Sequence, residues 1–138
     1  MAERELDEAT SRSEARKRRA ETRAQDAQRR VVVARRNADL ARNRGNARAA
    51  AVHDHEAAIH QRAVEIHLQA VRLQQDHAQE LADGLGRRGI DEIGLRNIMT
   101  NVRRARDEAA LRGEQARTYS LRARERAQKL HGHGVDGA

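Results

Sequence analysis

The sequence predicts an all-α fold: a long antiparallel helical hairpin, or coiled coil, that forms part of an oligomeric helical bundle. Apolar residues recur every three or four positions over most of the 138 residues, which is the spacing of one face of a helix. The chain has no proline and a single aromatic residue, Tyr119, so its apolar surface comes mostly from Ala, Leu, Ile and Val. Charged residues make up 36% of the chain, and this composition with a helical period is typical of long helices.

Residues 1–44 are predicted to form a basic helix rich in Ala and Arg, both of which favour helix formation. Its apolar residues alternate in steps of four and three, but almost all of them are alanine. Alanine lets helices approach closely and buries little surface, at about 0.8 kcal/mol per methylene group. We therefore expect a good helix with a weak core. The stripe consists of Ala20, Ala24, Ala27, Val31, Ala34, Ala38 and Ala41.

The segment around Gly45 has two interpretations. Gly45 suits the position just after a helix and Asn46 suits the N-cap of the next one, so a turn is possible. A continuous or bent helix, in which the stripe takes one extra step of four, is the alternative. The absence of proline favours the continuous helix.

Residues 45–82 are predicted to form a helix with a seven-residue repeat. A large apolar residue is followed directly by histidine, as in Ile59-His60 and Ile66-His67. Seven residues are two helical turns, so an apolar stripe and a histidine stripe lie side by side. We interpret the apolar stripe as the packing seam and the histidines as solvated positions beside it. The predicted interface residues are Val52, Ile59, Ala63, Ile66, Ala70 and Leu73.

The rest of the chain divides into a glycine-rich turn at 83–90, a return helix at 91–130 and a flexible tail at 131–138. The stripe of the return helix takes steps of three and four from Leu95 to Leu130 and includes Arg112 and Tyr119. We interpret Tyr119 as a core or interface residue. The interface residues predicted here are Leu95, Ile98, Val102 and Tyr119.

The lengths of the last two helices favour a hairpin. Both are about 57 Å long at 1.5 Å per residue, so an antiparallel arrangement sets them side by side. It also places the basic return helix beside the acidic segment 51–85. Residues 1–44 either fold back as a third helix or extend free. Because the aliphatic seam is thin, we expect a homo-oligomer, dimer or higher, or a protein partner.

The histidines suggest three alternatives. One is a metal site, but a spacing of seven residues separates two histidines by about 10.5 Å along the axis, and residues 91–130 contain no histidine. Solvated positions beside the seam are the interpretation we favour. A pH-responsive association surface is the third, because histidine titrates near neutral pH. We expect no metal and no cofactor.

Basic runs on residues 16–44 suggest phosphate binding by a helical surface. Acidic residues interleave with these arginines, which stabilises a helix by itself, and no aromatic residues are available for base stacking. Nucleic-acid binding would therefore be nonspecific. The candidate residues are Arg16, Lys17, Arg18, Arg19, Arg23 and Arg30.

Several classes of function lack support in the sequence. There is no cysteine, no phosphate-binding glycine motif after a strand and no arrangement of Ser, His and Asp that spacing supports, so we expect no catalysis. No apolar run approaches the roughly 18 residues that span a bilayer, and we expect a cytoplasmic protein without a membrane partner. The function predicted is that of a coiled-coil structural or adaptor protein. The alternative is a nonspecific nucleic-acid-binding, nucleoid-associated-like protein that uses the basic helix 16–44.

Overall fold

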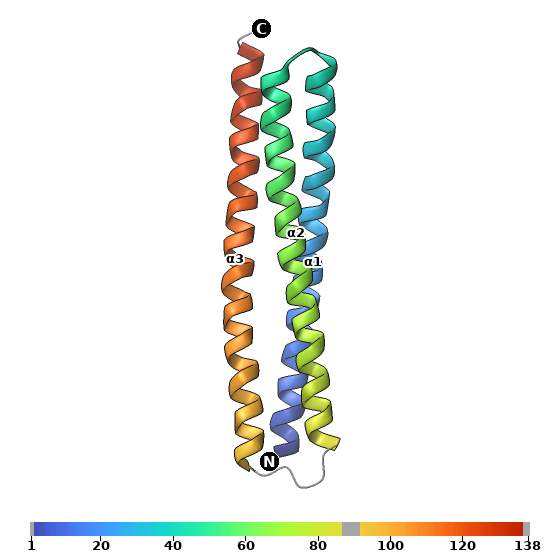
Figure 1. Cartoon of the computed structure of the whole chain (residues 1–138), viewed down its shortest axis with the longest axis vertical. Helices are drawn as coiled ribbons and strands as arrows, with labels where there is room; N and C mark the ends of the chain where they lie inside the picture. Colours follow the sequence, from blue (N-terminus) through green and yellow to red (C-terminus); the bar gives the residue numbers. More distant parts are fainter. Residues whose placement is uncertain (1, 87–91, 137–138) are drawn as a thin grey trace.

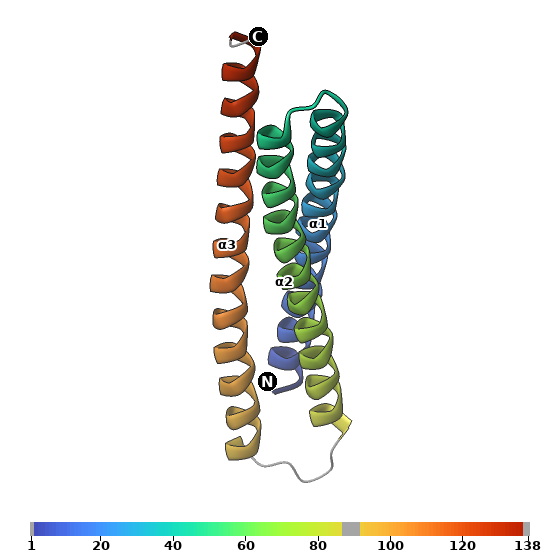
Figure 2. The same ribbon diagram turned by 45° about the horizontal axis from the view of Figure 1, so that its top comes forward.

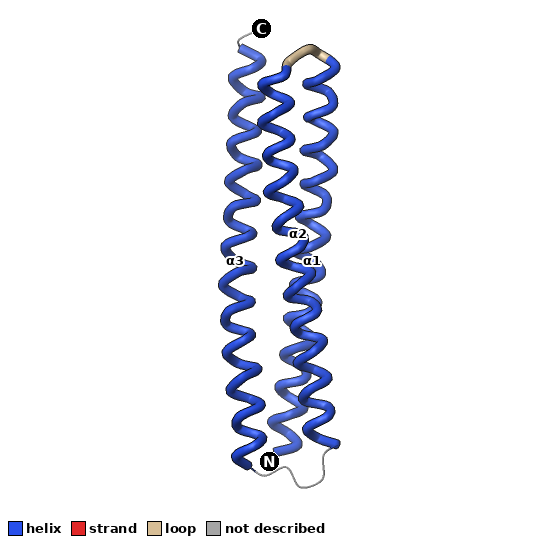
Figure 3. The backbone as a smooth tube through the Cα atoms, viewed as in Figure 1, coloured by secondary structure: helices blue, strands red, loops and turns tan. Residues whose placement is uncertain are grey.

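Three long helices make up the described part of the chain, so the predicted all-α fold with an antiparallel helical hairpin is confirmed. A computed structural model describes the backbone of residues 2–86 and 92–136 and the side chains of most of them. The helices are α1 (Ala2–Asn43), α2 (Ala47–Gly86) and α3 (Glu92–Asp136). Apart from the short turn between α1 and α2, the described residues are entirely helical (Figure 3).

The helices run up, down and up, side by side (Figure 1). α1 and α2 form the more extensive contact, α2 and α3 a smaller one, and the backbones of α1 and α3 approach each other at few places. In the upper half of Figure 2, α2 lies between α3 and α1, whereas in the lower half α1 passes behind α2. The first segment thus folds back as a third helix, and α2 is the central element of the molecule.

The junction between α1 and α2 is a turn, so the continuous helix that the lack of proline favoured is wrong. Gly45 has φ 73°, a left-handed conformation in which glycine pays no steric penalty. The amide of Asn46 donates to the Ala41 carbonyl at 2.9 Å and that of Gly45 to the Arg42 carbonyl at 3.0 Å, the pair of bonds that closes a helix C-terminus. Asn46 Oδ1 then accepts from the Ala49 amide at 3.0 Å and caps α2.

Small residues of α1 form one side of the core. All seven residues of the predicted alanine stripe of residues 1–44 are buried, which confirms that assignment. The buried apolar residues on the other helices are also mostly small, with Ala116, Ala123 and Ala127 on α3. A core of this kind lets helices approach closely while burying little apolar surface per residue.

Two boundaries differ from the sequence analysis. α2 continues through residues 83–86, where the glycine content predicts a turn, and residues 87–90 of the predicted turn lie outside the described residues. α3 continues through residues 131–136, which were assigned to a flexible tail. Both stretches contain glycine, which weakens a helix by about 1 kcal/mol per residue but, unlike proline, removes no hydrogen bond.

Candidate functional site: the polar interior and its two grooves

The histidine stripe of α2 faces the interior of the molecule. His53 and His60 are 0% exposed and His67 is 1% exposed, which makes them the largest fully buried side chains. The expectation that they lie solvated beside the seam is therefore wrong. Gln74, one heptad further, is also buried. Position in the heptad rather than hydrophobicity decides which stripe points inward here.

Small residues on α3 make room for these side chains. Ser120 Oγ contacts His60 Nδ1 at 2.6 Å, and in an antiparallel pair this places Gly113 opposite His67, seven residues away on each helix. A Cβ atom on Gly113 would lie 4.0 Å from His67 Nδ1. A ring on one helix thus fills the space left by a small residue on the other, which preserves close packing.

Residues of α1 complete each level of this arrangement, and we call each set of three a layer. Arg30 contacts Ser120, and Arg23 contacts Glu114 beside Gly113. The four layers repeat every seven residues on all three helices. They are Asn37–His53–Ala127, Arg30–His60–Ser120, Arg23–His67–Gly113 and Arg16–Gln74–Arg106.

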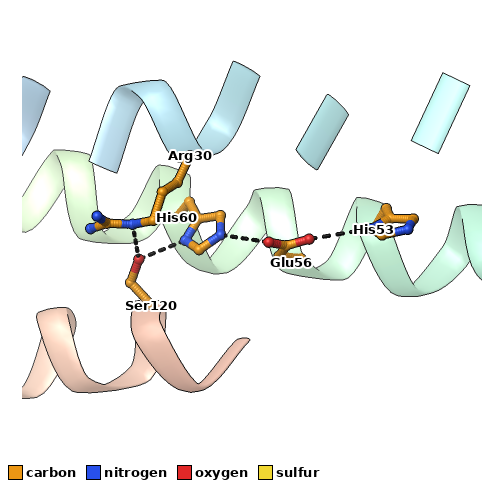
Figure 4. A network of polar contacts seen from close by, with 5 residues as sticks. All are labelled: Arg30, His53, Glu56, His60 and Ser120. Atoms are coloured by element: carbon orange, nitrogen blue, oxygen red, sulfur yellow. Dashed lines mark hydrogen bonds and ion pairs between the residues drawn. The ribbon is translucent and has the colours of Figure 1, made fainter. Parts of the chain in front are cut away.

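A row of hydrogen bonds connects the first two layers (Figure 4). Arg30 Nε donates to Ser120 Oγ at 3.0 Å, and the same oxygen lies 2.6 Å from His60 Nδ1. Because the Glu56 carboxylate only accepts, His60 Nε2 donates to Glu56 Oε2 at 3.0 Å, and in the tautomer with its proton on Nε2 the ring accepts at Nδ1 from the Ser120 hydroxyl. The other oxygen, Oε1, accepts from His53 Nδ1 at 3.3 Å. One buried carboxylate therefore serves both rings.

Glu56 is the buried acid at the centre of this row, with its side chain 8% exposed. Burial raises the pKa of its carboxyl, but the hydrogen bonds from His60 and His53 outweigh burial, and the pKa lies below its ordinary value. Glu56 is thus held as a carboxylate. One of its oxygens accepts from His53 and the other from His60, so the three side chains bind one another and do not point together at a common ligand position.

Within the part of the chain that the structure describes, the next histidine, His67, forms no hydrogen bond with a carboxylate. Burial lowers the pKa of its imidazole, and the charges of Arg23 and Arg30 lower it further. Glu114 opposes this effect and Arg117 adds to it. Among the described residues, His67 Nε2 finds no hydrogen-bond partner. The ring is buried, its surroundings disfavour the charged form, and its Nε2 atom lacks a hydrogen-bond partner within the described chain.

A polar groove of about 270 Å³ lies between α1 and α3 over the last two layers. The buried side chains of His67 and Gln74 form its floor. Gln74 Oε1, like His67 Nε2, has no hydrogen-bond partner within the described chain. The arginines that line the groove are Arg16, Arg19, Arg23 and Arg106.

The six candidate nucleic-acid-binding residues are divided between this groove and the surface. Three of them line the groove, namely Arg16, Arg19 and Arg23. Arg30 belongs to the neighbouring layer, where it donates a hydrogen bond to Ser120. The other two remain at the surface of α1, where Lys17 pairs with Glu21 at 3.9 Å and Arg18 is exposed. The structure thus brings three of them together in a groove between helices instead of arranging all six on one outer face.

An apolar groove follows the other edge of α3, where it meets α2. Two adjoining sections, of about 790 Å³ and about 210 Å³, share Ile66, Gln69 and Arg112. Ile59 lines the first section and Leu73 the second. The apolar heptad stripe that was predicted as the seam is therefore half-buried along this groove.

The remaining predicted interface residues belong to α2 and α3, and their side chains differ in how much of their surface is exposed. Ala63 is buried, whereas Val52, Ala70, Ile98 and Val102 are half-buried. Tyr119 is 60% exposed at the mouth of the groove, so it is not a core residue of the single chain. The Leu95 side chain lies outside the described residues.

Ser120 and Gly113 are not identified from the sequence, because the predicted α3 stripe lies one residue away, on Tyr119 and Arg112. Glu56 lies one turn before His60 in the sequence, but its role as a buried partner of two rings depends on the histidine stripe facing inward. The detectable signal was the pair Gly113 and Ser120, which has the same seven-residue spacing as His60 and His67. Small and large residues at matching spacing on antiparallel helices indicate facing positions.

Comparison of the chain with protein-family models, with curated proteins and with solved structures gives no match. Within the described residues, no helix is long and apolar enough to cross a bilayer. Nor do His, Asp and Glu side chains gather there in a group of three or more that could hold a metal ion.

Proposed function

We propose that this chain is a structural or adaptor protein that acts by self-association, in which the groove between α2 and α3 receives a second copy of the chain. The observation that carries this proposal is the apolar groove itself. Ile59 and Ile66 are half-buried there and Tyr119 is 60% exposed. A helix laid into the groove would complete the burial of these three side chains, which is the main driving force of helix association.

The size of the exposed surface supports self-association. The chain exposes 9756 Å², whereas a compact monomer of its mass exposes about 7,200 Å². Part of the excess belongs to any elongated bundle. The rest includes the apolar groove, and a standard interface removes about 800 Å² from each partner. The chain thus has enough surplus surface for an interface with a copy of itself.

The charges at the rim favour a second copy as the occupant. On the α2 side Arg62 lines the groove and pairs with Glu65 at 3.4 Å, and on the α3 side Glu108 and Arg112 line the groove. Each rim therefore carries both signs. A two-fold axis sets the same surface against itself, so a rim with both signs can oppose each arginine with a glutamate of the other copy.

The test is sedimentation equilibrium of the full chain and of two variants. Tyr119→Asp places a charge at the mouth of the groove. Leu111→Asp is the matched control, since Leu111 is 61% exposed on the same helix and does not line the groove. We expect an oligomer for the unaltered chain and for Leu111→Asp, and a dissociation constant raised about tenfold or more for Tyr119→Asp.

Circular dichroism of both variants controls for loss of helix. A triple variant, Ile59→Asp, Ile66→Asp and Ile98→Asp, should give monomers or unfolded chains. An unaltered chain that stays monomeric at about 100 µM, or equal dissociation by both single variants, would show that the groove is not the interface.

A further inference from the structure

The groove between α1 and α3 brings together positive charges that the described chain compensates only in part. Four arginines line it, and Glu114 is the only acidic residue among its lining residues. Glu114 contacts Arg23 at 2.9 Å. Asp107 lies outside the lining, 3.4 Å from Arg106. Within the described chain, Arg16 and Arg19 form no ion pair, so the groove carries a net positive charge.

The layer Arg16–Gln74–Arg106 concentrates this charge. Burial lowers the pKa of the Arg16 guanidinium, and Arg106, Arg12 and Arg19 lower it further by repulsion, whereas Asp107 opposes this effect. Two arginines from different helices thus face the same floor residue. Like charges held close in a partly buried groove repel each other, and an anion between them would relieve that repulsion.

The floor of the groove offers polar atoms that lack a partner. His67 is 1% exposed and Gln74 is 4% exposed, and both line the groove. His67 can place its proton on Nε2, and the Gln74 side chain can present either its oxygen or its amide nitrogen by rotation of the terminal amide. Both unpaired atoms are buried, and each side chain could donate one hydrogen bond to a bound group that reaches them. Leaving such groups buried and unpaired costs about 1–3 kcal/mol each.

The heptad shows what is missing at this site. Glu56 lies three residues after His53 and four before His60, and it binds both rings. The residue with the same relation to His67 and Gln74 is Ala70, which lines the groove. The carboxylate of Glu56 thus lies between the layers of His53 and His60, whereas Ala70 occupies the equivalent position between the layers of His67 and Gln74.

We propose that the α1–α3 groove binds a small multivalent oxyanion of the phosphate or pyrophosphate class. Arg16, Arg23 and Arg106 neutralise its charge, and His67 and Gln74 donate hydrogen bonds to it from the floor. The anion takes the part that Glu56 plays two heptads away, and it links α1 to α3 where the two helices otherwise make little contact. The groove of about 270 Å³ has room for a few phosphoryl groups.

The test is isothermal titration of the full chain with inorganic pyrophosphate and with inorganic phosphate at constant ionic strength. We expect saturable binding of one anion per chain. Arg16→Gln and Arg106→Gln should each weaken it about tenfold or more, because each removes a charge-assisted hydrogen bond. Arg36→Gln is the matched control, since Arg36 is exposed on α1 and does not line the groove.

Ala70→Glu is the sharpest variant, because it builds the missing carboxylate into the chain. It should abolish pyrophosphate binding and raise the melting temperature in the absence of anion. Ala70→Gln has the same shape without the charge, and it should retain more of the binding. The arginine variants keep the test decisive if Ala70→Glu fails to fold.

Two results would overturn the proposal. One is the absence of saturable binding at millimolar pyrophosphate, or an affinity that is the same in Arg16→Gln, Arg106→Gln and the unaltered chain. The other is tighter binding of a single-stranded oligonucleotide that Arg36→Gln weakens as much as Arg16→Gln. That result would indicate a diffuse polyanion-binding surface in place of a discrete site.

Discussion

Ser120 of α3 and His60 of α2 are joined by a hydrogen bond of 2.6 Å that fixes how the two helices lie against each other. Both side chains are 0% exposed, and Arg30 of α1 contacts the same hydroxyl at 3.0 Å. One small polar side chain thus connects all three helices at a single layer. In a core made mostly of alanine, where apolar packing discriminates weakly between registers, such a bond selects one register.

Replacing Ser120 should therefore weaken the fold more than its size suggests. Ser120→Ala leaves His60 Nδ1 and Arg30 Nε without their common partner, and we expect the free energy of unfolding to fall by about 1–3 kcal/mol. Urea denaturation followed by circular dichroism measures this. Thr118→Ala, at an exposed position of the same helix, should change stability by less than about 0.5 kcal/mol. Equal effects of the two substitutions would show that the buried bond selects nothing.

The buried carboxylate of Glu56 gives a second prediction. Glu56→Gln keeps the shape but replaces one accepting oxygen by an amide group that donates, so either His60 or His53 loses its partner. We expect a loss of about 1–3 kcal/mol at pH 7. Glu65→Gln is the matched control on the same helix, because Glu65 is half-exposed in an ion pair with Arg62 and such pairs contribute about 0–1 kcal/mol. A smaller loss for Glu56→Gln than for Glu65→Gln would contradict this account.

The sequence predicts the α1 stripe correctly because a single helix face contains all of its small apolar residues. From Ala20 to Ala41 no competing apolar face of similar length exists, so spacing alone identifies the buried side. The same periodicity predicts the helical hairpin of α2 and α3, but it leaves open whether residues 1–44 fold back as a third helix. The absence of proline even favours a continuous helix through Gly45, where the structure has a turn.

The interior of α2 could not be predicted in the same way. Ile59 and His60 are neighbours in the seven-residue repeat, so the apolar stripe and the histidine stripe are shifted by one position along the chain. Hydrophobicity favours burial of the isoleucine. What decides between the stripes is the space that α1 and α3 leave, and this depends on the register between helices. Gly113 and Ser120 carry that information, but it becomes usable only once α3 is known to lie antiparallel to α2 in this register.

Acidification should destabilise the fold, beginning below about pH 6.5. Burial, the largest cause, lowers the folded-state pKa of both His67 and His77. Arg23 and Arg30 face His67 and lower its pKa further, whereas Glu114 raises it. The unfolded chain gains a proton at these residues near the ordinary histidine pKa of about 6.5, and the folded chain resists it. The stabilising contribution is thus complete above that pH and is lost as pH falls through the folded-state pKa.

The measurement is the melting temperature between pH 7.5 and pH 5.5, first in the unaltered chain and then in His67→Gln. We expect a decrease in the unaltered chain and a smaller decrease in His67→Gln, because an amide does not titrate. His77, which faces the charged groups Glu80, Asp76 and Arg16, is still present in His67→Gln. Its contribution to the decrease in melting temperature therefore remains in that variant. His55→Gln, at an exposed position, should leave the decrease unchanged. A decrease that is identical in all three proteins would rule out His67 as a source of the pH dependence.

Two glycines should respond to alanine in opposite directions. Gly45 has φ 73° and nothing within 4 Å of an added Cβ, so the cost of Gly45→Ala is that of a left-handed backbone, about 1–2 kcal/mol. Gly113 lies inside α3, where alanine favours the helix by about 1 kcal/mol over glycine. Its added Cβ would meet Arg23 Nη1 at 3.7 Å and His67 Nδ1 at 4.0 Å, which is ordinary contact. We therefore expect urea denaturation to show a loss for Gly45→Ala and a gain for Gly113→Ala. If Gly113→Ala also destabilises the chain, the space that Gly113 leaves beside His67 is tighter than these distances allow.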